Sequence, residues 1–280
     1  MNILTIDVEE WFQLCEDCYS NGQWKNYEVR IYENVERIFR LLEDTNTKAT
    51  FFIVGWIAKE YPDLVRRISE KYEIGSHTLN HGLVWQQNRG EFKEDVSSSI
   101  KLLEDISGKS VKYFRAPGFS ITENEKWAFE VLKECGIEID CSVFPAPRAH
   151  GGIPNYGDIK PSIISYNGIE IKELPISIKK IAGNNIIFSG GGYFRLFPYW
   201  LIKSWTKDMD DYLISYIHPR DLDYGQPMIK DLSAIRKFKS YYGLKGAEDK
   251  LRHWLTDFEF VDIDTANKLI DWSNAPVVHL

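Results

Sequence analysis

The stretch YEIGSHTLNH, residues 72–81, places a short strand-like run directly ahead of two histidines. Residues 72–76 have the length of a buried strand, and His77 and His81 follow at its carboxyl end. In parallel α/β folds the loops after the strands gather at one edge and carry the functional site. This stretch therefore indicates both the kind of fold and the edge where its chemistry lies.

Similar short apolar runs recur along the chain, with helical patterns between them. Two apolar stripes at helical spacing lie over residues 35–42 and 92–103. Such alternation is typical of βαβ units and a parallel sheet. The seven predicted strands are residues 2–7, 49–54, 72–76, 111–115, 137–140, 212–217 and 258–263. Seven units predict an α/β fold with a closed or nearly closed barrel, and a doubly wound open sheet is the alternative.

Two local signals refine this pattern. Thr122 and Glu125 have capping-box spacing ahead of a predicted helix that ends at Gly136. Within residues 162–174, Asn167-Gly168 stands between two strand-like runs, which predicts an inserted β-hairpin. We find no repeat or linker, so we expect one domain over residues 1–280 with an insertion around 145–195.

Composition excludes several classes of function. Lys and Arg number 34 against 41 Asp and Glu, a net charge of −7, which argues against a nucleic-acid partner. The longest apolar stretch, residues 49–58, is too short to span a membrane. The N-terminal MNILTIDVEE has no basic region, so we expect no secretory signal and a cytoplasmic location. The four cysteines are expected to be free thiols, including the Cys15-x-x-Cys18 pair.

Ionisable side chains follow five of the predicted strands. On a helical turn, His77 and His81 would face the same way and could share one divalent cation, although two histidines with backbone partners are the simpler alternative. A carboxylate from the end of the first strand would complete a set of two histidines and one carboxylate. Glu9 is the candidate, with Glu10 as a substitute. The strand-end residues are Asp7, Glu9, Glu10, Ser76, His77, Thr78, His81, Arg115, Asp140, Ser142 and His218.

Other motifs have weaker interpretations. Arg115 precedes Ala-Pro-Gly, where the turn could present a backbone N–H, and an ordinary ion pair is the alternative role for this arginine. The run Ser189-Gly190-Gly191-Gly192 lacks the Lys-Ser or Lys-Thr of a nucleotide loop, so it indicates a close backbone approach. Aromatic residues in loops could stack on sugar faces, with core packing as the alternative; they are Trp11, Phe12, Trp24, Trp85, Phe119, Phe144, Tyr193 and Phe194.

Taken in order, these motifs resemble the polysaccharide deacetylase family, carbohydrate esterase family 4, also called the NodB-homology domain. The similar stretches are Thr5–Glu9, Lys48–Phe52, Glu73–His81, Arg115–Pro117, Asp140–Ser142 and Ile217–His218. The stretch GGGYFRLFPY, residues 190–199, and the His218-Pro219 loop also resemble a branch of the family associated with bacterial surface-polysaccharide assembly.

The resemblance implies a distorted (β/α)7 barrel and metal-dependent removal of an N-acetyl group from a sugar. It implies Asp7 as general base, Arg115 as the group that orients Asp7, His218 as general acid, and Asp140 as support for the acid–base network. The metal ligands would be Glu9, His77 and His81, with zinc expected and cobalt or nickel as alternatives. Glu9 stands where the family has a second aspartate, and Gly118 stands where an aromatic residue is common.

The expected substrate is an N-acetylated amino sugar in a polysaccharide, oligosaccharide or precursor. A metal-activated water would attack the amide, Asp7 would take its proton, and His218 would protonate the leaving amine. A backbone N–H near Gly118 would help to hold the oxyanion. Substrate-binding candidates are Gly118, Phe119, Phe144, Trp85 and Tyr193. Two alternatives stay open: a C–N hydrolase for cyclic imides or allantoin, and an inactive relative that binds glycans.

Overall fold

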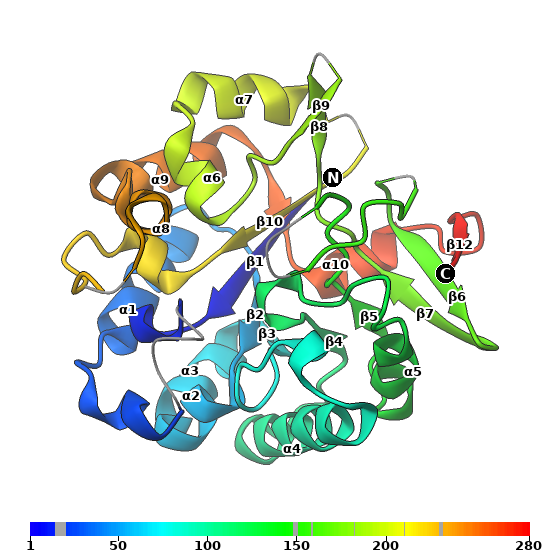
Figure 1. The fold of residues 1–280 in the computed structure, drawn as a ribbon. Helices are drawn as coiled ribbons and strands as arrows, with labels where there is room; N and C mark the ends of the chain where they lie inside the picture. Colours follow the sequence, from blue (N-terminus) through cyan, green and yellow to red (C-terminus); the bar gives the residue numbers. More distant parts are fainter. Residues whose placement is uncertain (15–20, 148–150, 158, 182, 210, 230–231) are drawn as a thin grey trace. The chain divides into compact units, whose positions relative to one another are not determined.

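The computed structural model describes residues 1–14, 21–147, 151–157, 159–181, 183–209, 211–229 and 232–280. Its contacts divide the chain into two compact units. Unit 1 consists of Met1–Ala49 and Lys179–Asp262, and unit 2 of Thr50–Ile178 and Ile263–Leu280. Each unit is thus built from two separate stretches of sequence, as the colours of Figure 1 show. The Cys15-x-x-Cys18 pair lies outside the described residues.

The sheet of unit 1 is centred on β1 (Asn2–Val8). This strand pairs in parallel with β10 (Leu213–Ile217) on one side and β11 (Phe260–Val261) on the other. Its apolar side chains on both faces are buried, as expected for a strand covered on both sides. Ile6 lies opposite Ile217, so β1 and β10 end at the same edge.

Helices and a small hairpin complete unit 1. The apolar stripe of residues 35–42 is confirmed, because its members are buried on α1. The helices are α1 (Ile31–Asp44), α6 (Gly191–Leu196), α7 (Tyr199–Lys207), α8 (Ala234–Tyr241) and α9 (Ala247–Asp257), with 3-10 turns at η1 (Trp11–Leu14), η2 (Asn21–Asn26), η5 (Pro219–Leu222) and η6 (Leu244–Gly246). The hairpin pairs β8 (Lys179–Ile181) with β9 (Asn184–Ile186).

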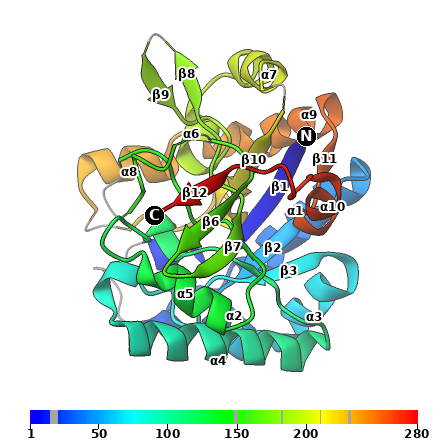
Figure 2. The same cartoon turned by 90° about the vertical axis from the view of Figure 1, so that its right-hand side faces the viewer.

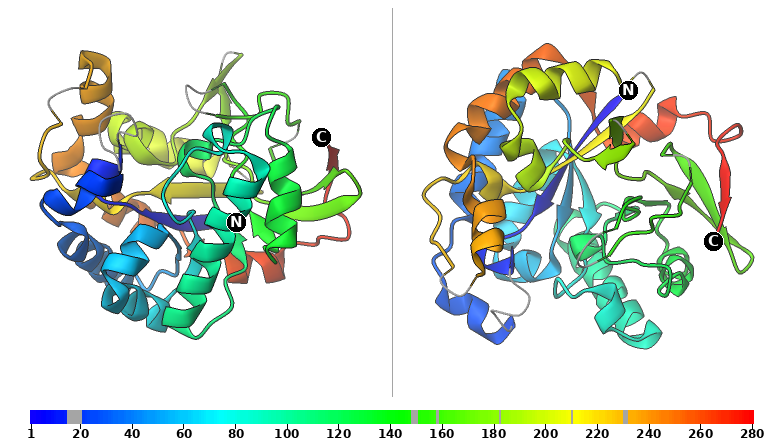
Figure 3. Two further views of the ribbon diagram at one scale, coloured as in Figure 1. Left: turned by 60° about the horizontal axis from the view of Figure 1, so that its bottom comes forward. Right: turned by 45° about the horizontal axis from the view of Figure 1, so that its top comes forward.

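Unit 2 contains a longer sheet in which most neighbouring strands are parallel. Its strands, in spatial order, are β2 (Thr50–Ile53), β3 (Glu73–Ser76), β4 (Tyr113–Phe114), β5 (Ile139–Asp140), β7 (Ile169–Glu173), β6 (Ser162–Tyr166) and β12 (Val277–His279). Its helices are α2 (Gly55–Glu60), α3 (Pro62–Lys71), α4 (Arg89–Ser107), α5 (Trp127–Glu134) and α10 (Ile263–Leu269), with 3-10 turns at η3 (Val84–Gln86) and η4 (Pro117–Phe119). Figure 3 shows α4 beside α5.

The predicted hairpin is confirmed as β6 and β7, which are antiparallel. Asn167 and Gly168 both have positive φ, at 47° and 82°, as a tight two-residue hairpin turn requires. β7 also pairs in parallel with β5, so the hairpin extends the sheet of unit 2 (Figure 2). Asp140 and Glu173 are direct partners in this pairing.

All seven predicted strands are present, but the predicted start of one helix is wrong. The capping-box spacing of Thr122 and Glu125 does not cap α5, which begins at Trp127 after an uncapped Lys126. The Thr122 hydroxyl instead donates to the Glu125 side chain in the turn ahead of the helix. Gly136 adopts the expected left-handed conformation just beyond the helix, with φ of 85°.

Two smaller expectations concern membranes and thiols. Among the described residues, none of the helices is long and apolar enough to cross a bilayer. Cys135 and Cys141 are free thiols, in agreement with the sequence.

Candidate active site

Unit 1 brings Asp7, Glu9 and His218 together at the carboxyl ends of β1 and β10. The Nε2 atom of His218 lies 3.9 Å from Oδ2 of Asp7 and 3.8 Å from Oε1 of Glu9. Both carboxylates are buried. The parallel register of the two strands produces this meeting, because Ile6 and Ile217 are paired just before the strands end. A proton acceptor and a proton donor therefore share one small region.

Two further residues, which the sequence analysis missed, support His218 from behind. Asp221 Oδ2 lies 2.9 Å from His218 Nδ1 and also accepts a 2.9 Å bond from the His218 backbone N–H. The Nε–H of Arg195 donates to the other Asp221 oxygen at 3.0 Å. The His218 ring is thus fixed with Nδ1 as donor and Nε2 directed at the acidic pair.

The charges around His218 decide its protonation. Burial lowers the pKa of the ring, but the nearby carboxylates of Glu9, Asp221 and Asp7 outweigh it and raise that pKa to about 9. Burial also raises the pKa of Asp221, yet Arg195 and His218 hold it below its ordinary value. In the structure as described, the imidazolium and the Asp221 carboxylate form one charge-balanced group.

Glu10 has a different role from Glu9. Its Oε1 atom accepts the backbone N–H bonds of Arg30, at 2.8 Å, and of Ile31, at 2.9 Å. It therefore supplies the cap that α1 lacks, since no side chain at the helix start does so. Burial raises the pKa of Glu10 to about 7, although the backbone hydrogen bonds act in the opposite direction. This engagement favours Glu9 over Glu10 as the carboxylate available for a ligand.

The triple glycine of residues 190–192 packs against the same edge of unit 1. Gly190 forms a β-bridge with Tyr216, and a Cβ there would lie 2.4 Å from that residue. A Cβ on Gly192 would lie 2.8 Å from the Lys239 carbonyl oxygen. The glycines therefore allow a close backbone approach beside His218, and the phosphate-loop interpretation has no structural basis.

In unit 2, His77 and His81 lie in the loop after β3, with ring centroids 5.3 Å apart. The expectation that a helical turn pairs them is wrong, because residues 77–82 form an irregular loop. Positive φ angles at Thr78, 62°, and at His81, 56°, bring the two rings to the same side. His77 Nδ1 is 2.7 Å from the Arg115 carbonyl oxygen, so Nδ1 carries the hydrogen and Nε2 the lone pair.

Asp95 of α4, which the sequence analysis also missed, holds this loop. Its carboxylate accepts the backbone N–H of Leu79 at 2.7 Å and of Asn80 at 3.2 Å. Burial raises the pKa of Asp95 despite these hydrogen bonds. The strained histidine loop is thus fixed by a side chain from a helix that packs on it.

Arg115 is fully buried at the end of β4. Its guanidinium lies over the Phe52 ring at 4.5 Å, and its Nε–H donates to the Cys141 carbonyl at 3.2 Å. The next residue, Ala116, donates its N–H to Ser142 Oγ at 2.8 Å. The strand ends β4 and β5 are therefore connected through Arg115 and Ser142.

Asp140 and Glu173 form a fully buried pair of carboxyl groups. Asp140 Oδ1 accepts the Ser142 hydroxyl at 2.6 Å, and Glu173 Oε1 accepts the Val143 N–H at 3.0 Å. Burial and the neighbouring Asp140 raise the pKa of Glu173 well above its ordinary value. Glu173 Oε2 has no donor among the described residues if both groups are ionised. A proton on Glu173 supplies the hydrogen bond to Asp140.

The predicted substrate-binding residues fall into two kinds. Phe119 and Phe144 are buried and in contact, with ring centroids 5.3 Å apart, beside Gly118, whose φ is 60°. Trp85 on η3 and Tyr193 on α6 are exposed, by 44% and 39%. The first pair can shape a pocket wall, whereas the exposed rings can stack on a ligand; these roles stay predictions.

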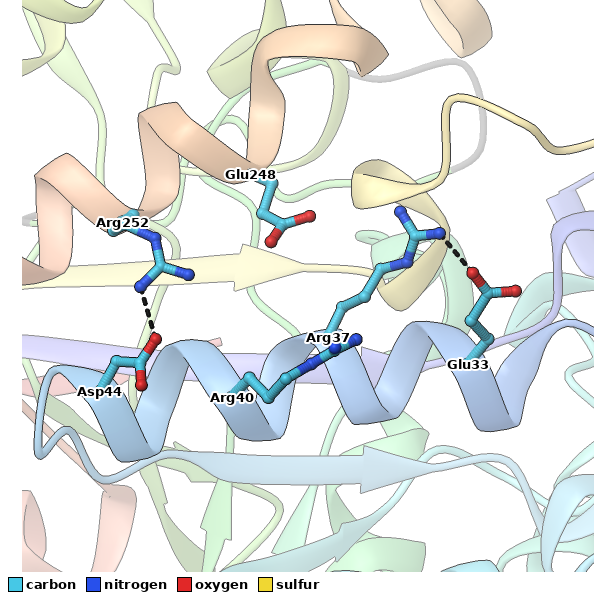
Figure 4. Close-up of a pocket in the computed structure, with 6 residues that line it drawn as sticks. All are labelled: Glu33, Arg37, Arg40, Asp44, Glu248 and Arg252. Atoms are coloured by element: carbon cyan, nitrogen blue, oxygen red, sulfur yellow. Dashed lines mark hydrogen bonds and ion pairs between the residues drawn. The ribbon is translucent and has the colours of Figure 1, made fainter.

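A hollow of about 380 Å³ in unit 1 contains none of the predicted site residues. It lies between α1 and α9 (Figure 4). Arg37 pairs with Glu33 there, and Arg252 pairs with Asp44 at 2.7 Å. Cations and carboxylates alternate around it, so it is a ladder of surface ion pairs that favours neither sign of ligand.

Comparison with known protein families shows which segments of the chain have relatives. The model of the polysaccharide deacetylase family matches residues 20–139. This segment of the chain is therefore similar to polysaccharide deacetylases. Residues 141–268, which include His218 and Asp221, match a domain of unknown function, DUF3473. The matched segments thus divide the chain close to the end of β5.

Curated proteins are similar to this chain over a limited segment. A peptidoglycan-N-acetylglucosamine deacetylase of Bacillus cereus is 35% identical over 100 residues, which are 35% of this chain and 36% of the relative. A chitooligosaccharide deacetylase of Azorhizobium caulinodans is 37% identical over 82 residues, 29% of this chain and 39% of that protein. The chain thus spans less than two-fifths of the length of these relatives.

Solved structures support the fold over the whole chain. A Mycobacterium smegmatis protein described as of polysaccharide deacetylase type has a TM-score of 0.69 at 16% identity, covering 100% of this chain and 92% of that one. A family 4 pseudoenzyme of Bacillus anthracis has a TM-score of 0.52 at 14% identity, covering 100% and 69%. These likenesses confirm the α/β fold class and the distorted (β/α)7 barrel of the polysaccharide deacetylases.

Proposed function

We propose that this chain is a metal-dependent hydrolase that removes the acetyl group from the nitrogen of an amino sugar. The observation that carries the proposal is the directed His218 of unit 1. Its Nδ1 side is held by Asp221 at 2.9 Å, and its Nε2 side is directed at Asp7 and Glu9. Amide hydrolysis requires a proton acceptor for water and a proton donor for the amine, and these groups provide both.

We propose Glu9, His77 and His81 as the metal ligands, which is the set that the resemblance to the family implies. Two imidazole nitrogens and a carboxylate are a donor set suited to zinc, with cobalt or nickel as alternatives. The tautomer of His77 supports the assignment, because Nδ1 donates to the Arg115 carbonyl and leaves the Nε2 lone pair as ligand. When bound, the cation would polarise the amide carbonyl and lower the pKa of its water.

The protein side chains then move two protons. Asp7 accepts a proton from the water as the water oxygen bonds to the acetyl carbon. His218 gives its Nε2 proton to the sugar nitrogen as the C–N bond breaks, so that acetate and a free amine leave. Asp221 stays ionised and stabilises the imidazolium, while Arg195 holds Asp221 at 3.0 Å. Arg115 is proposed to orient Asp7, and a backbone N–H near Gly118 to hold the oxyanion.

An N-acetylated amino sugar is the substrate class that the relatives support. Those relatives are named as deacetylases of peptidoglycan N-acetylglucosamine and of chitooligosaccharide. The exposed rings of Trp85 and Tyr193 are suited to stack on sugar faces, and the Phe119–Phe144 pair to contact an acetyl methyl. We propose a glycan or glycan precursor, with these residues as binding contacts.

The test is acetate release from chitooligosaccharides and peptidoglycan fragments by protein loaded with zinc, cobalt or nickel. We expect turnover that stops after the metal is removed and returns when it is added back. Cyclic imides and allantoin are assayed in parallel, and turnover limited to them would move the protein to another class of C–N hydrolase. Glycan binding without acetate release under every metal would identify an inactive relative, as the Bacillus anthracis pseudoenzyme is described to be.

A further inference from the structure

Unit 1 exposes several large apolar side chains on and around α8. Ile235 is 71% exposed, Phe238 52% and Tyr242 51%. Met228, in the loop before the helix, and Leu196, on α6, are also exposed. We call these five residues the α8 surface. Several large exposed apolar side chains on neighbouring elements are typical of an interaction surface.

The geometry of α8 turns part of this surface outward. Ile235 and Phe238 follow the i, i+3 spacing of one helix face, and the ring of Tyr242, the residue just after the helix, lies 4.8 Å from that of Phe238. Ser240 is the buried residue of α8, so most of the helix faces solvent. Figure 1 shows α8 at the periphery of unit 1, near α6.

Hydrogen bonds hold the helix in this position from beneath. The buried Arg195 of α6 donates to the Tyr242 carbonyl at 2.6 Å and to the Lys239 carbonyl at 2.9 Å. The Tyr241 hydroxyl accepts from the Ile229 N–H at 2.8 Å and donates to the Pro227 carbonyl at 3.1 Å. The exposed face is therefore a fixed part of the fold, and the loop that carries Met228 is tied to it.

The charge around the α8 surface has the opposite sign to the chain as a whole. Residues 232–246 contain four basic side chains and lack Asp and Glu, although the chain has a net charge of −7. The four basic residues are Arg236, Lys237, Lys239 and Lys245. Within the described part of the chain, none of them forms an ion pair. Exposed apolar groups bordered by unpaired cations are typical of helices that lie at an anionic lipid interface.

We propose that the α8 surface docks on the face of an anionic lipid bilayer. Ile235, Met228 and Leu196 have no flat ring to stack on a sugar, which argues against a glycan as the occupant. A second copy of the chain would bring the same four cations together across a two-fold interface, which is unfavourable. A bilayer accommodates the aliphatic groups and attracts the cations. The proposal does not depend on the deacetylase activity.

The experiment is co-sedimentation of the intact protein with lipid vesicles. The vesicles contain either phosphatidylcholine or a mixture of phosphatidylcholine and phosphatidylglycerol. We expect binding to the mixed vesicles that weakens as salt is raised. The double variant Lys237→Gln, Lys239→Gln should bind roughly twenty-five-fold more weakly, since each basic residue at the surface contributes about fivefold. The variant Ile235→Ser, Phe238→Ser should lose at least about tenfold through its apolar contacts.

Matched controls change the same residue types elsewhere. Lys101→Gln, Lys133→Gln removes two exposed cations, and Val29→Ser, Leu269→Ser removes two exposed apolar groups. Both controls should bind like the parent. The proposal is overturned if the parent ignores the anionic vesicles, or if the controls lose as much binding as the α8 variants. Light scattering that shows a dimer dissociated by Phe238→Ser would assign the surface to a second copy of the chain instead.

Discussion

The Nδ1 atom of His218 lies 2.9 Å from an oxygen of Asp221, three residues further along the same loop. The resemblance to the family assigns the support of the acid–base network to Asp140, yet the described contacts of Asp140 are with Ser142 and Glu173. In this chain the residue that orients His218 comes from its own loop, and Arg195 secures it from α6.

Asp221→Asn tests this relationship. The amide keeps the size of the side chain but removes the negative charge that stabilises the imidazolium. We expect kcat for acetate release to fall at least about a hundredfold, with little change in KM or in the melting temperature. Asp208→Asn, which alters an exposed carboxylate paired with Lys179, is the matched control and should behave like the parent. Equal activity of both variants would exclude Asp221 as the positioning residue.

The double variant His77→Ala, His81→Ala tests the metal assignment. Without the two imidazoles, a single carboxylate is left, and we expect loss of the stoichiometric divalent cation as measured by elemental analysis. His253→Ala, an exposed histidine of α9, should keep the metal. Full metal content in the double variant would show that the cation binds elsewhere.

Asp7→Asn separates the base from the ligand set. The amide cannot take a proton from water, so acetate release should fall by about two to four orders of magnitude. Because Asp7 is not among the proposed ligands, metal content and melting temperature should match those of the parent. Activity near that of the parent would mean that another group acts as the base.

Glu173→Gln tests the shared proton of the buried pair by its effect on stability. The pKa of Glu173 is higher in the folded protein than in the unfolded chain. The folded protein therefore binds more protons than the unfolded chain once the pH exceeds the pKa that Glu173 has in the unfolded chain. The contribution of the protonated pair to the free energy of unfolding is therefore complete below the unfolded-chain pKa of Glu173. This contribution is lost as the pH rises towards the folded-state pKa. Gln keeps the geometry and removes this titration.

The measurement is the free energy of unfolding of parent and variant at pH values from below the unfolded-chain pKa of Glu173 up to its folded-state pKa. The stability of Glu173→Gln relative to the parent should improve steadily as the pH rises. Glu170→Gln, an exposed change on the same strand, should show a difference from the parent that does not vary in this way. A relative stability of Glu173→Gln that is independent of pH would contradict protonation of the pair.

Much of the fold can be predicted from local sequence, because its strands are short apolar runs between helical patterns. Asn167-Gly168 also marks its hairpin correctly, since both residues tolerate positive φ. β12 (Val277–His279) was missed because it is short and its residues are exposed or only partly buried. The start of α5 was predicted wrongly because the Thr122–Glu125 bond stabilises a turn and not the helix.

The site is less predictable, because its supporting residues act through contacts between distant elements. Asp95 reaches the histidine loop from α4, and nothing in its local sequence indicates this. Two signals were nevertheless present. The spacing of His218 and Asp221 allows a bond within one turn, and Glu173 shares the buried parity of Ile171 on β7.

The discontinuity of unit 1 has a consequence for the order of folding during synthesis. The first 49 residues include β1 and the carboxylates Asp7 and Glu9, but the other part of the unit begins only at Lys179. β10, which aligns His218 with those carboxylates, leaves the ribosome some two hundred residues after β1, since Ile6 pairs with Ile217. A nascent chain therefore carries Asp7 and Glu9 without His218 until β10 has been synthesised. The proposed acid–base group therefore depends on a pairing between distant parts of the chain and cannot form from the first segment of unit 1 alone.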